Sequence, residues 1–336
     1  MIKLIHQLKY ATTFVLFYLG FISFTSSGIY CWIPFLFTFF FVPGVELFLS
    51  PSTKNFSEIE EQLEKSNKIY DYILYIVPLV QFYALWTFLS GFQEQSLTQF
   101  EIAGRIIAMG LLCSIFGINV AHELGHRSNK GEQFLAKCLL LTSLYMHFFI
   151  EHNKGHHHKV GTPSDPSTAK LNQSVYAFYK QTFVGTYLHA WKIDFKEMLV
   201  FQLIQIAFVC SIYVWFGPQI TVYFLLSALL GSTILETVNY IEHYGLSREL
   251  VRDKVYERVK PQHSWNSNHV LGRLLLFELS RHSDHHYLAS RKYQVLRHME
   301  DAPQMPTGYP GMILLSLIPP LWFRVMHKQM RKYDLL

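Results

Sequence analysis

Histidines dominate the chemistry that this sequence can perform. The chain has 17 histidines in 336 residues, and nine of them fall into four groups. The groups are His122 and His126; His152, His156 and His157; His243; and His282, His285 and His286. Three groups contain a pair spaced four residues apart, which puts two imidazoles on one helix face. Imidazole binds Zn, Cu, Fe or Ni. One ion takes about four to six ligands, so the sequence predicts two metal ions.

Carboxylates beside these histidines are expected to offset the charge of the metal ions and to orient the imidazole rings. Four acidic residues directly adjoin a predicted ligand: Glu123, Glu151, Glu242 and Asp284. Glu236 and Asn239 precede His243 on the same helix face. An ionisable residue in an apolar segment is expensive, so Glu236 is predicted to have a function. The residues predicted to act in the reaction are Glu236, Asn239, Glu123 and Asp284.

Several other histidines are predicted to lie outside the ligand set. His158 follows His157 directly but points about a third of a turn away from the helix face of the pair. His263 and His269 lie in a polar segment and are expected to have a structural role or to support a ligand. The isolated histidines, His147 and His189 among them, are predicted to be core or interfacial residues.

The composition indicates an integral membrane protein. Hydrophobic residues make up 50% of the chain and charged residues only 16%, against about 25% in a typical soluble domain. Residues 10–45 contain no Asp, Glu, Lys or Arg, and this stretch of 36 residues exceeds one span of about 20 residues. The composition excludes a disordered chain, a collagen and a nucleic-acid-binding arm. The four cysteines show no paired spacing, which excludes a disulfide framework.

We therefore predict an all-α fold with six transmembrane helices in a single membrane-embedded catalytic domain, residues 1–336. The predicted spans are residues 10–25, 29–45, 72–92, 102–121, 199–216 and 220–242. Gly217 and Pro218 are expected to turn the last two spans into a hairpin. The first span could instead be a signal peptide. Residues 312–323 are apolar but short and interrupted by two prolines, so we expect them to be interfacial or docked.

The basic residues predict the orientation. Lys and Arg number nine in residues 127–197 and fourteen in residues 243–336, whereas the intervening turns and the loop 93–101 have none. The positive-inside rule places the basic segments in the cytoplasm. Both termini, and the histidine-rich segments 122–197 and 243–336, are therefore predicted to be cytoplasmic.

The motifs around the histidines resemble those of the membrane-bound alkane 1-monooxygenases, or alkane hydroxylases, of the fatty-acid desaturase superfamily. The matching segments are HELGHR (122–127), EHNKGHHHKVGTPSDPSTA (151–169), NYIEHYGL (239–246), HSWNSNH (263–269) and RHSDHHYLASRKYQVLR (281–297). The three histidine boxes alone indicate only the superfamily. NYIEHYGL together with HSWNSNH is narrower and resembles the alkane hydroxylase branch.

This resemblance implies a non-haem di-iron enzyme of the bacterial inner membrane. It would use O2 to hydroxylate the terminal methyl of medium-chain n-alkanes, which reach it through the lipid bilayer. Its electrons would come from rubredoxin and its NAD(P)H-dependent reductase, and it would have no nucleic-acid partner. The implied iron ligands are His122, His126, His152, His156, His157, His243, His282, His285 and His286.

Four alternatives compete with this hypothesis. An alkylaromatic (xylene-type) monooxygenase and a fatty acyl desaturase or hydroxylase belong to the same superfamily. His122, Glu123 and His126 also fit the HExxH pattern of an intramembrane zinc protease, which would leave six histidines without a role. A metal transporter would need polar groups through its spans, and most of the spans have almost none.

Overall fold

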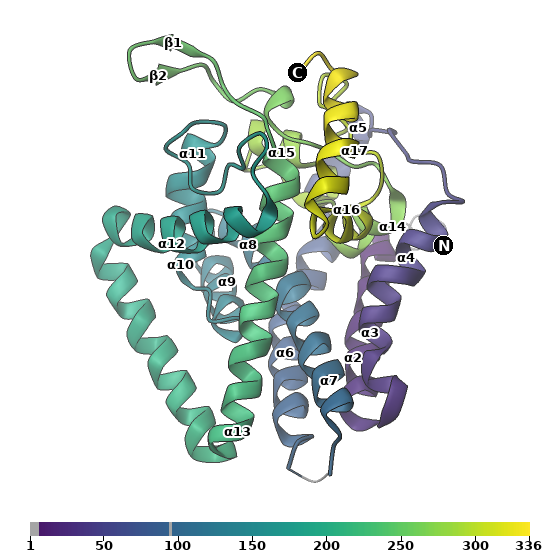
Figure 1. The fold of residues 1–336 in the computed structure, drawn as a ribbon, viewed down its shortest axis with the longest axis vertical. Helices are drawn as coiled ribbons and strands as arrows, with labels where there is room; N and C mark the ends of the chain where they lie inside the picture. Colours follow the sequence, from purple (N-terminus) through teal and green to yellow (C-terminus); the bar gives the residue numbers. More distant parts are fainter. Residues whose placement is uncertain (1–6, 94–95) are drawn as a thin grey trace. The chain divides into compact units, whose positions relative to one another are not determined.

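The computed structural model describes residues 7–93 and 96–336, which are mostly helical (Figure 1). The predicted cytoplasmic N-terminal end, residues 1–6, and residues 94 and 95 of the loop 93–101 lie outside the described residues. Internal contacts divide the chain into two compact units, each assembled from separate stretches. Unit 1 comprises Met1–Phe41, Asn67–Phe149 and Asp194–Leu235, and unit 2 comprises Val42–Ser66, Ile150–Ile193 and Glu236–Leu336. The prediction of one catalytic domain stays a prediction.

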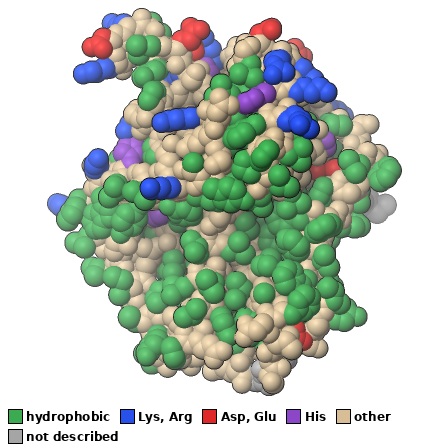
Figure 2. Space-filling model, in the orientation of Figure 1, with side chains coloured by type: hydrophobic (Ala, Val, Ile, Leu, Met, Phe, Trp, Pro, Cys, Tyr) green, Lys and Arg blue, Asp and Glu red, His purple; other side chains and the backbone are tan. Residues whose placement is uncertain are grey.

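Unit 1 is built from apolar helices. Its elements are η1 (Leu8–Phe14), α2 (Val15–Thr25), η2 (Gly28–Trp32), α3 (Ile33–Leu36), η3 (Phe37–Phe41), α6 (Ile69–Ser90), α7 (Gln99–Leu112), η4 (Cys113–Ile118), α8 (Asn119–Gly125), α9 (Lys130–Thr142), the start of α10 (His147–Glu151) and most of α13 (Phe195–His243). The surface over α6, α7 and α13 carries mostly hydrophobic side chains (Figure 2). Within the unit α2 packs on α6 and α7, and α9 packs on α6 and α8. Apolar residues on the outside of a helical unit suit a lipid environment.

Polar groups hold the turns of unit 1. Thr98 and Glu101 form a capping box at the start of α7. Glu101 also accepts a hydrogen bond of 2.6 Å from the backbone N–H of Gly28, in the turn that follows α2. The buried guanidinium of Arg105 donates to the carbonyl oxygens of Gly91 and Ser26, each at 2.8 Å. Charged side chains therefore satisfy backbone groups at the ends of three apolar helices.

Five helices are long and apolar enough to cross a membrane among the described residues: Leu8–Thr25, Gly28–Glu46, Ile69–Ser90, Gln99–Gly125 and Phe195–His243. Each predicted span coincides with one of these helices to within a few residues, and the fifth and sixth predicted spans both fall within Phe195–His243. That element is not one straight helix. Gly217 has a φ of 80° and a ψ of 174°, and α13 bends there into two arms (Figure 1). The predicted turn at Gly217 and Pro218 is therefore present.

Unit 2 contains shorter helices and one hairpin. Its elements are α4 (Val42–Glu46), α5 (Glu58–Ser66), η5 (His152–His156), α11 (His157–Lys159), α12 (Val175–Ile193), the end of α13, β1 (Leu250–Arg252), β2 (Val255–Tyr256), η6 (Pro261–His263), α14 (Val270–Leu275), α15 (His282–Tyr287), η7 (Tyr293–Val295), α16 (Tyr309–Ser316) and α17 (Pro319–Arg331). Strands β1 and β2 are antiparallel, with Leu250 opposite Tyr256. Residues 312–316 belong to α16 and residues 319–323 to α17, and the buried Trp322 docks α17 within the unit.

Gly217→Ala should destabilise the protein by about 1–3 kcal/mol, because only glycine readily adopts a positive φ with an extended ψ. A Cβ at this position would meet nothing within 4 Å, so the cost comes from the backbone and not from a clash. Thermal unfolding in detergent should show a lower melting temperature than that of the wild type. The control is Gly44→Ala, in a helix and also with open space at the Cβ, which should leave the melting temperature unchanged or slightly raised. Equal melting temperatures for Gly217→Ala and the wild type would contradict the expected strain.

Candidate metal centre

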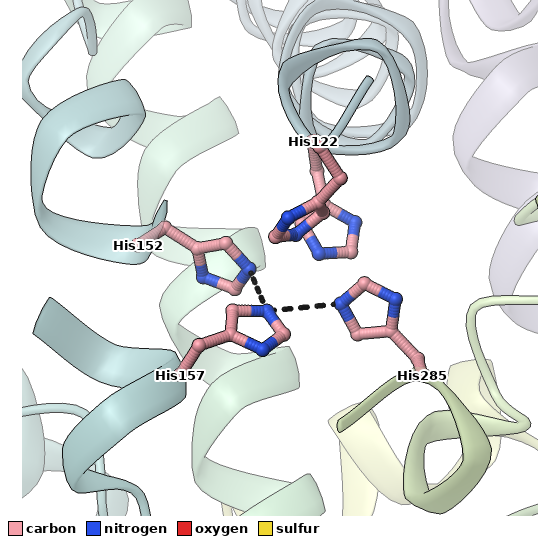
Figure 3. Close-up of side chains that lie close together, drawn as sticks. His122, His152, His157 and His285 are labelled. Carbon is pink, nitrogen blue, oxygen red and sulfur yellow. Dashed lines mark hydrogen bonds between the residues drawn. The ribbon is translucent and has the colours of Figure 1, made fainter. Parts of the chain in front are cut away.

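Three histidines of unit 2 direct their imidazole nitrogens at one another. Nε2 of His157 lies 3.0 Å from Nε2 of His152 and 3.1 Å from Nε2 of His285 (Figure 3). His152 and His285 are buried, and His157 is half-buried. His152 and His157 come from the η5–α11 segment and His285 from α15, so the group joins parts of the chain that are far apart in sequence. We name these residues the three-histidine group.

A second set of imidazoles forms in the same unit. His156, His243, His282 and His286 are all buried, and their ligand atoms lie within 4.8 Å of one another. Nε2 of His282 lies 3.1 Å from Nε2 of His243 and 2.9 Å from Nε2 of His286. We name these residues the four-histidine group. It draws on η5, on the last residue of α13 and on α15.

A π-helical turn decides which histidine enters which group. Residues His152–His156 form the π-helical η5. A π-helix brings residues five apart into register, and His152 accordingly meets His157. His156 lies four residues after His152 yet belongs to the four-histidine group. The spacing of four residues therefore does not assign the predicted ligands to groups.

Unit 1 contains a histidine pair at the end of one helix. His122 lies on α8 and His126 is the residue directly after α8, one turn further on, with ring centroids 4.8 Å from each other. The π-helical η4 directly precedes α8. Glu123 of the same helix accepts hydrogen bonds of 3.0 and 2.6 Å from Arg127, which also forms an ion pair with Asp71 at 3.2 Å. Glu123 thus anchors a buried arginine just after the histidine pair.

Other polar groups contact the Nδ1 atoms of the imidazoles of unit 2, on the side of each ring away from the centre of its group. Nδ1 of His156 donates to Asp165 at 2.9 Å, and Nδ1 of His243 donates to the carbonyl oxygen of His263 at 3.3 Å. Nδ1 of His282 lies 3.2 Å from Oε1 of Glu242. Fixing one ring nitrogen in this way leaves the other one aimed at the centre of the group, as in many metal sites. Glu242 was predicted for this role from its position next to His243, whereas Asp165 was not singled out.

Glu242 is itself held by an aromatic side chain. The hydroxyl of Tyr309 donates to Oε1 of Glu242 at 2.8 Å. Burial raises the pKa of Tyr309, and the neighbouring carboxylate raises it further, so the hydroxyl keeps its proton. Tyr309 lies 67 residues from Glu242 in the sequence. No local motif points to this pairing.

The remaining predicted site residues divide into two kinds. Glu236 and Asn239 touch each other, because the Asn239 amide donates to Oε2 of Glu236 at 3.2 Å, and the hydroxyl of Thr182 donates to the same oxygen at 2.5 Å. Asp284 instead accepts a backbone hydrogen bond of 2.8 Å from Arg297 and lies 3.1 Å from Nε of Arg291. The contacts of Asp284 therefore hold the segment after α15 in place.

Two further histidines have defined positions. His158 is exposed and belongs to neither group. His189 was expected to be an isolated core or interfacial residue, but its Nδ1 lies 2.8 Å from Oε1 of Glu151 and its Nε2 lies 2.6 Å from Nζ of Lys159. His189 of α12 therefore supports the segment that carries three of the predicted ligands. Nothing in the spacing of the sequence indicates that role.

The chemistry of the two groups fits metal ions. Nitrogen lone pairs at 2.9–3.1 Å repel unless a proton or a cation lies between them. Nε2 of His156 is buried and has no hydrogen-bond partner among the described residues, while Nδ1 of the same ring is occupied by Asp165. Burial and the neighbouring histidines lower the pKa of His286 well below its usual range, so this ring is neutral, as a metal ligand must be.

Comparison with known proteins agrees with this geometry. A sequence model of the family described as fatty acid desaturase matches residues 100–316, which is more than half of the chain. An alkane 1-monooxygenase of Pseudomonas putida is 38% identical over 281 residues, covering 80% of this chain and 69% of the relative. Alkane 1-monooxygenase 2 of Alcanivorax borkumensis is 36% identical over 327 residues, covering 92% of this chain and 85% of the relative. The chain belongs to the alkane 1-monooxygenase family.

More distant members of the superfamily match less well. The hydroxylase component of a xylene/toluene monooxygenase from Pseudomonas putida is 28% identical over 249 residues, covering 70% of this chain and 66% of the relative. Similarity to the two alkane 1-monooxygenases described above is thus higher and extends over more of the chain. The resemblance predicted from the histidine motifs is confirmed.

Asp165→Asn should lower the affinity for metal about 10- to 100-fold, because the neutral amide no longer stabilises the donating ring of His156 through its charge. The measurement is metal content after dialysis against a graded chelator series. Asp301→Asn removes an exposed carboxylate from the same unit and serves as the control. Equal chelator resistance of the Asp165 variant and the wild type would show that Asp165 does not support a metal ligand.

Proposed function

We propose that this chain is a non-haem di-iron alkane 1-monooxygenase that converts medium-chain n-alkanes to 1-alcohols. The observation that carries the proposal is the pair of histidine groups in a chain of the alkane 1-monooxygenase family. The reaction RH + O2 + 2e− + 2H+ → ROH + H2O is balanced with two external electrons. Iron supplies the redox chemistry that activates O2, and the protein supplies ligands, orientation and an apolar site.

The proposed ligand set divides according to the two groups. The three-histidine group would hold one iron and the four-histidine group the other. We propose that His122 and His126 of unit 1 are the two remaining iron ligands. Seven imidazoles of unit 2 and two of unit 1 then account for all nine predicted ligands. A zinc protease would use only a few of them, which is why we do not favour it.

Residues that do not bind metal are proposed to orient the ligands. Asp165 and Glu242 hold the outer nitrogens of His156 and His282. Glu236 is buried at the same end of α13 as His243, and the Thr182 hydroxyl and the Asn239 amide fix one of its oxygens. A carboxylate held by two donors has a defined position, so we propose that Glu236 and Asn239 line the site rather than bind iron. Glu123 and Asp284 act through the arginines that they hold.

The substrate proposal rests on the relatives and on apolar chemistry. An n-alkane gains about 0.8 kcal/mol per methylene on leaving water, so it concentrates in the bilayer. The alkane can then enter a helical unit with apolar surfaces directly from the bilayer. The lower identity to the xylene/toluene monooxygenase component favours an alkane over an alkylaromatic substrate.

The electron donor is proposed to be rubredoxin, reduced by an NAD(P)H-dependent reductase. The chain has no paired-cysteine motif for an iron–sulfur centre and no Gly-rich dinucleotide fingerprint. Its cysteines all stand as separate thiols. We propose six spans, with the two arms of α13 as the fifth and sixth, and with both termini and all histidine clusters in the cytoplasm of a bacterial inner membrane.

His285→Ala and His286→Ala should each remove about half of the bound iron or more and abolish turnover, since each removes a ligand from a different group. Iron is measured by elemental analysis of the purified protein. His158→Ala is the matched control, because this neighbouring histidine is exposed and lies in neither group. Full iron content in both ligand variants, or zinc in place of iron in the wild type, would refute the di-iron proposal.

Cells or membranes containing the protein should convert octane to 1-octanol with one oxygen atom from labelled O2, when rubredoxin, its reductase and NADH are supplied. Gas chromatography with mass detection identifies the product. An acyl desaturase would give an alkene without label, and an alkylaromatic enzyme would oxidise xylene methyls faster than octane. The purified chain with NADH alone should be inactive, because it lacks its own electron carrier.

Reporter fusions should confirm the orientation. A fusion after Gly131 and one after Arg331 should both report the cytoplasm, and one after Leu97 should report the external side. The positive charges of residues 127–197 and 243–336 are the physical reason. A cytoplasmic signal at Leu97 would exclude the six-span topology.

A further inference from the structure

Unit 2 exposes large apolar side chains where the chain leaves a candidate membrane span. Leu47 and Phe48 directly follow the span Gly28–Glu46, and their exposed fractions are 80% and 89%. The end of this span is α4, which belongs to unit 2 and packs against α16. The apolar surface of the span therefore continues beyond the last residue of its helix.

The linker between α16 and α17 is a second exposed apolar segment. Residues 317–321 have the sequence LIPPL, without a charged or polar side chain. Leu317, Ile318 and Leu321 are exposed, whereas Trp322, the next residue, is fully buried. Trp322 thus attaches the start of α17 to the unit, and the linker presents its apolar side chains outward.

Helix α12 has a third exposed apolar surface. Tyr176, Val184 and Tyr187 are exposed and recur at helical spacing. The exposed Lys180 lies on the same side of the helix. Tyrosine and lysine beside aliphatic residues are typical of the boundary between lipid and water, where their polar ends reach the headgroups. The candidate span Phe195–His243 begins two residues after α12 ends, so α12 leads directly into a span.

Two contacts join these three segments within unit 2. The hydroxyl of Tyr176 donates a hydrogen bond of 2.7 Å to the carbonyl oxygen of Leu317. The helix α16, which ends one residue before Leu317, packs against α4. We name the exposed apolar side chains of the turn 47–49, of α12 and of the linker 317–321 the apolar face. A connected apolar surface of this kind marks a contact with an apolar partner.

We propose that the apolar face lies in the lipid bilayer, at the boundary between headgroups and acyl chains, with the linker 317–321 as its deepest part. The chain leaves one candidate span at α4 and enters another after α12, so both ends of the face continue into helices that lipid surrounds. Interfacial segments of this kind enter the boundary by about 5–10 Å. Unit 2 is then held at the membrane by its own side chains as well as by the spans.

Helix α17 provides a depth scale for this arrangement. Leu321, Arg324 and Lys328 are exposed on one side of the helix, at spacings of three and four residues. With a rise of about 1.5 Å per residue, Arg324 lies about 4.5 Å and Lys328 about 10 Å along the helix from Leu321. A guanidinium one turn beyond the linker can bind lipid phosphate groups, and Lys328 lies in water. The change from apolar to basic side chains matches the change from acyl chains to headgroups.

Quenching of a fluorescent label tests this placement in the full-length protein. The label is attached to a single new cysteine, in a chain whose two cysteines that are not buried, Cys138 and Cys210, are replaced by serine. The labelled variants are Ile318→Cys, Leu321→Cys, Arg324→Cys and Lys328→Cys. In vesicles of phosphatidylethanolamine and phosphatidylglycerol, the ratio of quenching by doxyl-labelled lipid to quenching by aqueous iodide should fall several-fold in that order.

Two reference positions calibrate the ratio. Val214→Cys lies on an exposed side of the first arm of α13 and should be quenched mainly by the lipid reagent. Asp301→Cys changes an exposed residue of unit 2 outside the apolar face and should be quenched mainly by iodide. Val184→Cys on α12 tests the face independently of the linker, and it decides the result if the linker variants do not fold.

The outcomes are distinct. Iodide quenching at Ile318, Leu321 and Val184 as strong as that at Asp301 would overturn the lipid contact. A label that neither reagent reaches would also overturn it, because a protein partner or a second copy of the chain would then cover the face. Lipid quenching that decreases toward Lys328 would support it. The experiment does not measure octane oxidation, so a failure of the proposed alkane reaction would leave this result unchanged.

Discussion

Six imidazoles of unit 2, three in each group, have an Nε2 atom 2.9–3.1 Å from the Nε2 of a neighbouring ring, and these contacts constrain the rest of that unit. Neutral rings in such an arrangement cannot all be satisfied by hydrogen bonds to one another, because each ring has one donor and one acceptor nitrogen. A cation at the centre of each group would satisfy the rings of that group together. The π-helical η5, the end of α13 and α15 are the elements that bring the nitrogens to this arrangement. The π-helical turn of η5 and the shortness of α15 are explained if the positions of the imidazole nitrogens, and not helix packing, determine the path of the backbone here.

The carboxylates around the rings are placed to offset positive charge that metal ions would bring into the buried site. The two divalent ions that we propose, held only by neutral ligands, would carry about four positive charges into a site with little water. Asp165 and Glu242 lie directly behind ligand rings and return negative charge at the distance of one imidazole. Tyr309 and Thr168 in turn donate to these carboxylates. Carboxylates thus support the imidazole rings, and hydroxyl groups in turn support the carboxylates. The residues with these hydroxyl groups come from segments with no histidine.

Much of this arrangement can be predicted from the sequence, because the two strongest signals are local. Charge-free stretches locate the apolar helices, and Gly217 with Pro218 locates the bend in α13. The histidine clusters are visible from composition and spacing. The division of His152 and His156 between two groups is not, since it depends on a π-helical turn that ordinary helix spacing does not reveal. The contacts of Asp165 with His156 and of Tyr309 with Glu242 cannot be predicted from the sequence either. They depend on how the chain folds between the two partners.

The contact between His157 and His285 joins residues 128 positions apart in the sequence. A metal ion held by both rings would act as a cross-link and close that long loop. In the chain-entropy picture, a covalent link across about 100 residues stabilises the folded state by roughly 4–5 kcal/mol. Metal binding and folding would then be coupled. With iron as the proposed metal, cells short of iron would accumulate less of the folded enzyme, so iron supply would set the amount of protein that survives as well as its activity.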